Sequence, residues 1–244
     1  MAPIARGLSA SYRVIEPFQR GSGGERLTVA RHVADLHEII DVYAQRCHPA
    51  LLGASWGAML ALAYAAAHPT STGPLILVGC GTFDVGARAE LQAAIAERMT
   101  DDIRARLKGA DLLDQDQRLK ASAEAMLPVY ACDLLASPHE DDHVDARAHH
   151  ETWEDMLRMQ AEGIYPAAFA AIKVPVLMIH GTYDPLPGGL IFKGLRPYLP
   201  QLEYWELERC GHYPWLERVA ADPFFSLVRD WLARRIVAAR PMTC

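Results

Sequence analysis

The chain has few of the features that direct a protein to nucleic acid or to a membrane. Its 244 residues carry 24 lysines and arginines against 30 aspartates and glutamates, and the net charge of −6 gives no basic footprint for nucleic acid. No apolar run approaches the roughly 20 residues that a membrane-spanning helix needs. The first residues also lack the basic-then-apolar form of a signal peptide. We therefore expect a cytoplasmic protein without nucleic-acid or membrane partners.

Cysteine is scarce, and its placement does not suggest a metal site. The five cysteines are odd in number and scattered along the chain, so we expect reduced, mostly buried thiols rather than disulfides. Cys210 lies close to His212, but packing is its expected role. The stretch His139-Glu-Asp-Asp-His143 could bind a metal if it were helical. Because no third spaced ligand is evident, a solvated acidic segment is the favoured interpretation, and no metal or cofactor is expected.

The stretch from Pro49 to Tyr64 is the most informative part of the sequence. A short apolar run leads into Gly53-Ala-Ser55-Trp-Gly57, and an alanine-rich helical pattern follows. A strand that turns at once into a helix holds its turn residue in a strained backbone geometry. Small residues at Gly53 and Gly57 are expected to let the strand and helix pass closely. Ser55 would then present its hydroxyl above the sheet edge, although a structural turn serine is the alternative.

Trp56 follows the turn serine and begins the helical pattern. Its backbone N–H is expected to aim at the same point as the Ser55 hydroxyl. One such donor is half of an oxyanion hole, which binds the negative charge that develops during acyl transfer.

Apolar runs that alternate with helical patterns predict a mostly parallel sheet flanked by helices, an α/β fold. Five strands are expected, and they begin at Tyr12, Leu51, Leu75, Val174 and Leu202. Helical patterns cover residues 3–10, 28–46, 190–199 and 223–237, and Thr28 is expected to cap the second of them. Between residues 83 and 172 only helical patterns occur, which predicts a cap over the site. The expected domains are a core of residues 1–82 and 173–244 and a helical cap of residues 83–172.

Two further polar residues follow expected strands. Asp184 and His212 each lie in a loop just after an apolar run, and the carboxyl ends of parallel strands share one edge. A serine needs an imidazole to take its proton, and the imidazole needs a carboxylate to hold its tautomer. We therefore expect Ser55, His212 and Asp184 to form a catalytic triad. Asp84 is the rival acid, and a structural loop histidine is the alternative role for His212.

With these motifs in place, the chain resembles the α/β-hydrolase family from about residue 3 to its end. The matching motifs are Gln19-Arg-Gly-Ser-Gly, Gly53-Ala-Ser-Trp-Gly, Gly181-Thr-Tyr-Asp and Cys210-Gly-His. The first two are similar to the proline iminopeptidase branch, although Phe18 stands where that branch has an aspartate. The candidates for that branch's amino-terminus-binding carboxylates in the cap are Glu151, Glu154 and Glu162.

The resemblance implies a serine hydrolase that needs no cofactor and acts on a small ester, amide or amino-terminal peptide bond. Its substrate would be a small molecule or short peptide. The family also has strands and a His-Gly-Gly-type oxyanion loop ahead of the segment that residues 3–10 resemble, and nothing in residues 1–11 matches them. The chain is therefore interpreted as N-terminally incomplete.

Other functions stay open beside this one. The alternative is a non-catalytic or truncated α/β-hydrolase-like protein with an incomplete oxyanion hole. A carbon–carbon bond hydrolase with the same triad is also compatible with the motifs. A hydrolase with an aspartate nucleophile is disfavoured, because Ser55 occupies the elbow.

Overall fold

The computed structural model describes residues 2–44, 47–138 and 144–238. Within these residues the centre is a four-stranded parallel sheet with the strand order β1-β2-β3-β4. The strands are Leu51–Ala54 (β1), Leu75–Val78 (β2), Val176–Gly181 (β3) and Leu202–Leu207 (β4). The register aligns Leu51 with Leu75, Leu75 with Val176, and Val176 with Leu202. All strand carboxyl ends therefore meet at one edge, and four of the five expected strands are confirmed.

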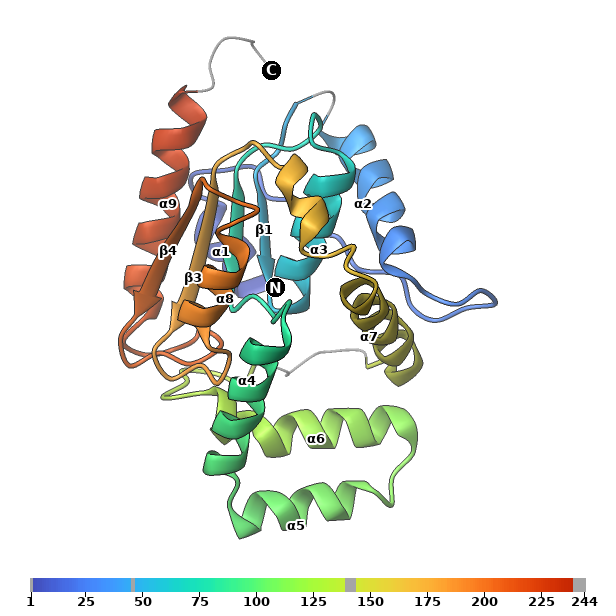
Figure 1. Ribbon diagram of the computed structural model, residues 1–244. Helices are drawn as coiled ribbons and strands as arrows, with labels where there is room; N and C mark the ends of the chain where they lie inside the picture. Colours follow the sequence, from blue (N-terminus) through green and yellow to red (C-terminus); the bar gives the residue numbers. More distant parts are fainter. Residues whose placement is uncertain (1, 45–46, 139–143, 239–244) are drawn as a thin grey trace.

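Helices cover both faces of this sheet (Figure 1). One face is covered by α2 (Val29–Tyr43), α3 (Trp56–Ala67), the 3-10 helix η1 (Ala167–Ala171) and α8 (Gly188–Leu195). The other face is covered by α1 (Ala2–Leu8) and α9 (Ala221–Ala238). Along β2, Leu75 and Leu77 pack into the first core and Ile76 and Val78 into the second, because successive strand side chains alternate in direction. This double burial explains the continuous apolar run of β2.

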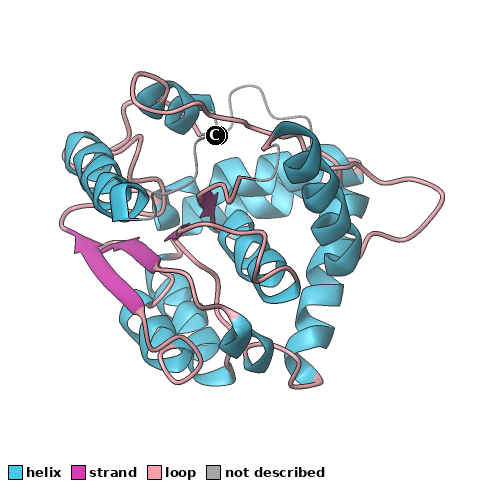
Figure 2. Ribbon diagram, turned by 90° about the horizontal axis from the view of Figure 1, so that it is seen from above, coloured by secondary structure: helices cyan, strands magenta, loops and turns pink. Residues whose placement is uncertain are grey.

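Four further helices lie between β2 and β3 in the chain. They are α4 (Val85–Arg98), α5 (Asp101–Ala110), α6 (Gln115–Tyr130) and α7 (Ala146–Ala161). Each begins after a side chain that accepts the N–H three residues later, and these caps are Asp84, Thr100, Asp114 and Asp145. Figure 1 shows α4, α5 and α6 outside the layers of the sheet, whereas α7 lies against α2. Seen from above, the magenta strands lie between cyan helices (Figure 2). The helices match the expected segments, and their role as a cap stays a prediction.

The strand expected at Tyr12 does not form, so that prediction is wrong. Residues 13–23 have no regular structure, and Val14 and Ile15 are 38% and 43% exposed. Tyr12 instead donates its hydroxyl to the carbonyl oxygen of Arg229 on α9, at 3.2 Å. A β-prone run becomes a strand only where a neighbouring strand completes its ladder. In the described part of the chain, residues 13–23 pair with no strand, and the outer side of β1 stays unpaired.

The cysteines also correct the sequence analysis. Cys80, Cys132 and Cys210 carry free thiols, as expected, whereas Cys47 is disulfide-bonded. A disulfide requires two Cβ atoms at about 3.5–4.5 Å. The fold sets that distance, and spacing along the chain does not reveal it.

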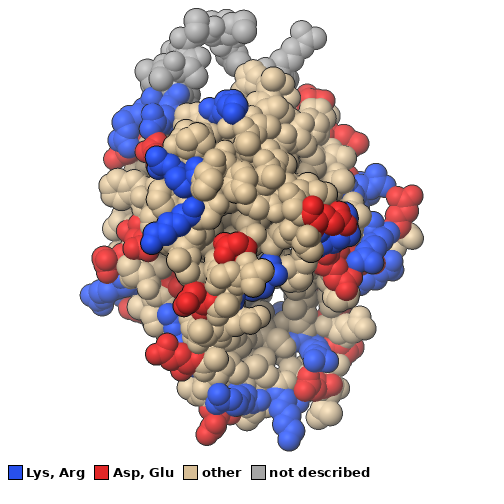
Figure 3. Space-filling view, viewed as in Figure 1, with Lys and Arg blue, Asp and Glu red and all other residues tan. Residues whose placement is uncertain are grey.

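The surface seen in Figure 3 carries mixed charge, with acidic and basic side chains interspersed over the face. Among the described residues, no helix combines the length and the apolar character that crossing a membrane requires.

The turn from β1 into α3 requires a residue without a side chain at position 53, which is Gly53. A Cβ atom on Gly53 would lie 2.1 Å from the Gly57 carbonyl oxygen and 2.6 Å from the Ala58 nitrogen. Gly57 differs, because a Cβ atom on it would meet no atom of the described residues within 4 Å. The expected close approach is thus present at Gly53, whereas the absence of a side chain at Gly57 is not needed for packing.

We expect Gly53→Ala to lower the free energy of unfolding by about 1–3 kcal/mol, since the added methyl group forces α3 away from β1. Gly57→Ala is the matched control: it should be neutral or stabilising by up to about 1 kcal/mol, because alanine is favoured over glycine in a helix. Urea unfolding of both variants measures the difference. Equal destabilisation by the two substitutions would contradict this account of the turn.

Candidate active site

Ser55 lies in the turn between β1 and α3 and has strained backbone angles, φ 53° and ψ −117°. A non-glycine residue with positive φ is uncommon and often marks a functional turn. The Ser55 N–H donates to the Val78 carbonyl oxygen at 2.8 Å, which ties the turn to the end of β2. Its hydroxyl makes no capping hydrogen bond to α3 within the described chain. Trp56 is the first residue of α3, where backbone N–H groups lack an intrahelical acceptor.

His212 and Asp184 form a buried hydrogen-bonded pair. His212 Nδ1 lies 2.8 Å from Asp184 Oδ2, and the two side chains are 7% and 0% exposed. The other carboxylate oxygen, Oδ1, accepts the Leu186 N–H at 3.1 Å. With Nδ1–H donating to the carboxylate, the Nε2 atom of the neutral ring is left as a proton acceptor.

Gly79, the residue that follows β2, provides the surface on which this pair packs. A Cβ atom there would lie 2.7 Å from His212 Nδ1 and 3.3 Å from Asp184 Oδ2, and the Gly79 φ angle is 54°. The Ser55 N–H is hydrogen-bonded to the carbonyl oxygen of Val78, the residue just before Gly79. The serine turn and the His–Asp pair therefore both contact the end of β2. The sequence analysis missed Gly79, although a glycine directly after a buried strand was a visible signal.

Two residues considered in the sequence analysis have structural roles here. Asp84 Oδ1 accepts the Ala87 N–H at 2.8 Å and so caps α4. Among the described residues, the carboxylate in contact with His212 belongs to Asp184. Cys210 is fully buried, and burial together with the charges of Glu217 and Asp184 raises the pKa of its thiol. A thiol in that environment is a packing group rather than a nucleophile.

The histidine motif at residues 139–143 lies outside the described residues. Within the described residues, no group of three or more histidine, cysteine, aspartate or glutamate side chains is arranged to hold a metal ion.

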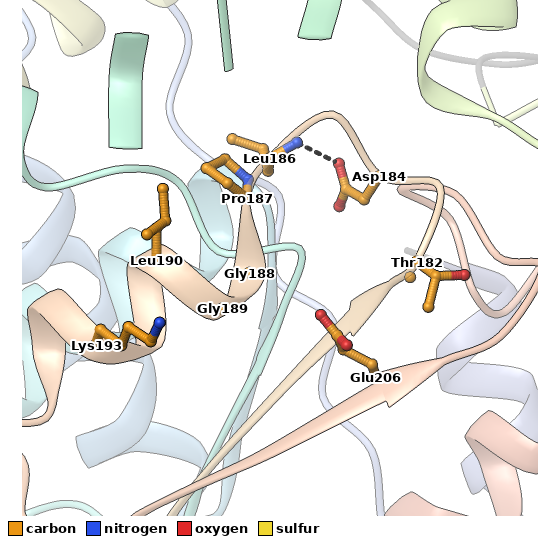
Figure 4. A pocket seen from close by; sticks show the side chains of 10 residues that line it. Thr182, Asp184, Leu186, Pro187, Gly188, Gly189, Leu190, Lys193 and Glu206 are labelled. Atoms are coloured by element: carbon orange, nitrogen blue, oxygen red, sulfur yellow. Dashed lines mark hydrogen bonds between the residues drawn. The ribbon is translucent and has the colours of Figure 1, made fainter. Parts of the chain in front are cut away.

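A cavity of about 310 Å³ opens beside Asp184 (Figure 4). Lys193 projects from α8 and Glu206 from β4 along its lining, and Asp184 contributes from the loop after β3. Ser55 and His212 do not line it. The cavity therefore adjoins Asp184 and is not lined by the other two residues of the expected triad.

The family model described as the alpha/beta hydrolase family matches residues 1–224. The chain belongs to the α/β-hydrolase family. It is 30% identical over 240 residues to the 2-hydroxymuconate semialdehyde hydrolase of Pseudomonas sp. (strain CF600), covering 95% of this chain and 80% of that protein.

Solved structures show the same fold for this α/β hydrolase. The crystal structure of VinJ gives a TM-score of 0.67 at 19% identity, over 96% of this chain and 85% of that one. The proline iminopeptidase of Mycobacterium smegmatis gives 0.57 at 18% identity, over 87% of this chain and 73% of that one. At these identities the likeness is one of fold, so the resemblance to α/β hydrolases is confirmed.

His180 is a second histidine beside Asp184. It lies on β3 and is 1% exposed, and its Nδ1 is 3.7 Å from Asp184 Oδ2, which is beyond hydrogen-bond distance. Burial lowers the pKa of His180 to about 4, and the Asp184 charge offsets only part of that effect. The ring is therefore neutral at pH 7.

We expect His180 to make the fold sensitive to acid. The unfolded histidine binds a proton near its ordinary pKa of 6.5 and the folded one only near 4, so the unfolded state holds more protons between these values. Stability should therefore fall by about 3 kcal/mol as the pH drops from 6.5 to 4. In His180→Asn the fall should be smaller by about this amount, whereas the exposed control His48→Asn should behave as wild type. Urea unfolding across this pH range measures the slopes, and equal slopes in all three proteins would refute the assignment.

Proposed function

We propose that the chain is a serine hydrolase in which Ser55 attacks an acyl carbon, His212 moves the proton and Asp184 orients the imidazole. The observation that carries this proposal is the buried 2.8 Å bond between His212 and Asp184 beside the strained Ser55 turn. Because Nδ1 is held by the carboxylate, Nε2 of His212 is the atom that accepts the Ser55 proton and returns it to the leaving group. The negative charge of Asp184 stabilises the imidazolium that forms in between.

Trp56 N–H supplies one oxyanion donor in this proposal. As the first residue of α3 it lies at the positive end of the helix dipole, which favours a developing negative charge. The alternative of a non-catalytic protein with an incomplete oxyanion hole rests on the second donor, which the motifs do not identify. The lack of one donor costs roughly 10²–10³ in rate, so an active triad would still turn over measurably.

The three carboxylates considered for binding a substrate amino terminus are already paired. Glu151 accepts from the Leu27 N–H at 2.8 Å and from Arg147 at 2.7 Å. Glu154 lies 2.5 Å from Arg26. Glu162 lies 2.7 Å from Arg158. Glu151 is buried and already accepts from two donors, so it is not available to a substrate ammonium ion, which supports a small ester or lactone over an amino-terminal peptide bond. The pairs of Glu154 and Glu162 are exposed and contribute little to this argument.

A carbon–carbon bond hydrolase is the second candidate, and one observation favours it. The relative named 2-hydroxymuconate semialdehyde hydrolase matches 95% of this chain at 30% identity. The same triad fits such a reaction. Ser55 would attack the carbonyl carbon, the carbon–carbon bond would break, and the carbon atom of the leaving group would take the proton from His212. Water would then release the acid from Ser55.

We also propose that the helices of residues 83–172 cap the site, since α4 follows the loop that leaves the end of β2 and α6 ends beside His212. A cytoplasmic location stays a prediction. The free thiols of Cys80 and Cys210 are compatible with it.

We expect Ser55→Ala to abolish covalent labelling by a fluorophosphonate probe, because the probe reacts with an activated serine. Turnover of a generic ester should fall by about 10⁴-fold or more, while the fold is retained. Intact-protein mass spectrometry of wild type and variant measures the labelling, and circular dichroism checks the fold. Equal labelling of the two proteins would show that another residue reacts.

A substrate panel distinguishes the candidate reactions. We expect p-nitrophenyl acetate, a small lactone or 2-hydroxymuconate semialdehyde to be cleaved at least about 100-fold faster, by kcat/KM, than the proline p-nitroanilide used for iminopeptidases. The reason is that the buried Glu151 is held by the Leu27 N–H and by Arg147. Preferential cleavage of the anilide would contradict this and restore the iminopeptidase interpretation.

A further inference from the structure

Glu217 is a fully buried carboxylate just beyond His212 in the chain, and it is 0% exposed. Its Oε1 accepts the N–H groups of Gly211 at 3.0 Å and Cys132 at 2.9 Å, and its Oε2 accepts the N–H of Asp133 at 2.6 Å. A buried carboxylate is costly unless donors surround it, and these three backbone groups provide that compensation.

The three donors come from two different segments. Gly211 precedes His212, whereas Cys132 and Asp133 follow the end of α6. The same two segments are joined by backbone bonds, from the His212 N–H to the Tyr130 carbonyl at 2.7 Å and from the Arg218 N–H to the Asp133 carbonyl at 2.8 Å. We call this contact the α6 joint, formed by Tyr130, Cys132, Asp133, Gly211 and Glu217.

The α6 joint leaves no room for rearrangement near His212. A Cβ atom on Gly211 would lie 2.2 Å from the Tyr130 carbonyl oxygen and 2.7 Å from Glu217 Oε1. The Tyr130 ring also meets the His212 ring edge to face, with centroids 5.6 Å apart. The backbone at residues 211 and 212 is thus clamped between Glu217 and the end of α6.

We propose that Glu217 is a positioning residue: by clamping residues 211 and 212 against the end of α6, it holds the His212 ring in register with Asp184. This rests on the proposed function, in which His212 is the base. A displacement of about 1 Å in a reacting group can cost 10²-fold in rate, so the clamp bears directly on proton transfer.

Glu217→Gln is the sharpest test, because it keeps the shape of the side chain. Its NH₂ group must face at least one of the three N–H donors, so one or two hydrogen bonds are lost. We expect the rate of fluorophosphonate labelling, and kcat for p-nitrophenyl acetate, to fall by about 10- to 100-fold, with KM within about twofold.

Two further variants flank this test. Gly211→Ala opens the same joint from the other side and should also lower kcat. Arg218→Gln is the matched control, because it removes only the 3.1 Å ion pair with Asp133 on the exposed side of the joint. Exposed pairs contribute little, so Arg218→Gln should label at the wild-type rate. Should Glu217→Gln lose its circular dichroism spectrum, Gly211→Ala decides the question.

A second readout needs no turnover. The Nδ1–H proton of His212, bonded to Asp184, should give a protected downfield NMR signal in wild type and in Arg218→Gln, and that signal should broaden or vanish in Glu217→Gln. Wild-type labelling rate together with a retained signal in Glu217→Gln would overturn the proposal. A wild type that is never labelled would instead refute the serine hydrolase, while the NMR signal would still decide the role of Glu217.

Discussion

The hydrogen bond between His212 and Asp184 is the interaction that constrains the packing of the surrounding loops and strand ends. A carboxylate with a side chain 0% exposed is tolerated only when its oxygens are occupied, and here His212 and the Leu186 N–H occupy them. The pair packs directly on the backbone of Gly79, where a side chain would collide with the His212 ring. Asp184, His212 and the strained Ser55 turn follow different strands, so the register of the parallel sheet sets their separation.

Much of this fold could be predicted because local signals and burial agree. The apolar run of β2 is buried on both faces, the bounds of β4 coincide with its sequence pattern, and Thr28 caps α2 as expected. Tyr12 shows where such reasoning fails. Its β-prone run has the right residue types, but a strand depends on a neighbour supplied by another part of the chain. The prediction of a free thiol at Cys47 fails for the same reason, because disulfide bonding depends on which segments the fold brings together.

In the candidate site, too, some residues could be predicted from the sequence and others could not. Motif order placed Ser55, Asp184 and His212 after strands, and the structure brings the last two into contact. Glu217 could not be found this way, since its partners come from two segments about eighty residues apart in the chain. Glu151 shows the opposite error. It looked available for a substrate, yet it accepts the Leu27 N–H ahead of α2 and pairs with Arg147. Sequence shows which residues are charged, and only packing shows which charges remain unpaired.

The end of α6 also contacts the loop that carries Asp184. Arg98 donates to the carbonyl oxygens of Val129 and Tyr183 at 2.8 and 2.6 Å, and the Tyr183 hydroxyl donates to the Pro128 carbonyl at 3.2 Å. One turn of the inserted helices thus fixes the loops of both Asp184 and His212. The end of α5 and the first turns of α6 lie away from that turn (Figure 1). The outer surface of the insertion can therefore change without displacing the contacts that hold Asp184 and His212.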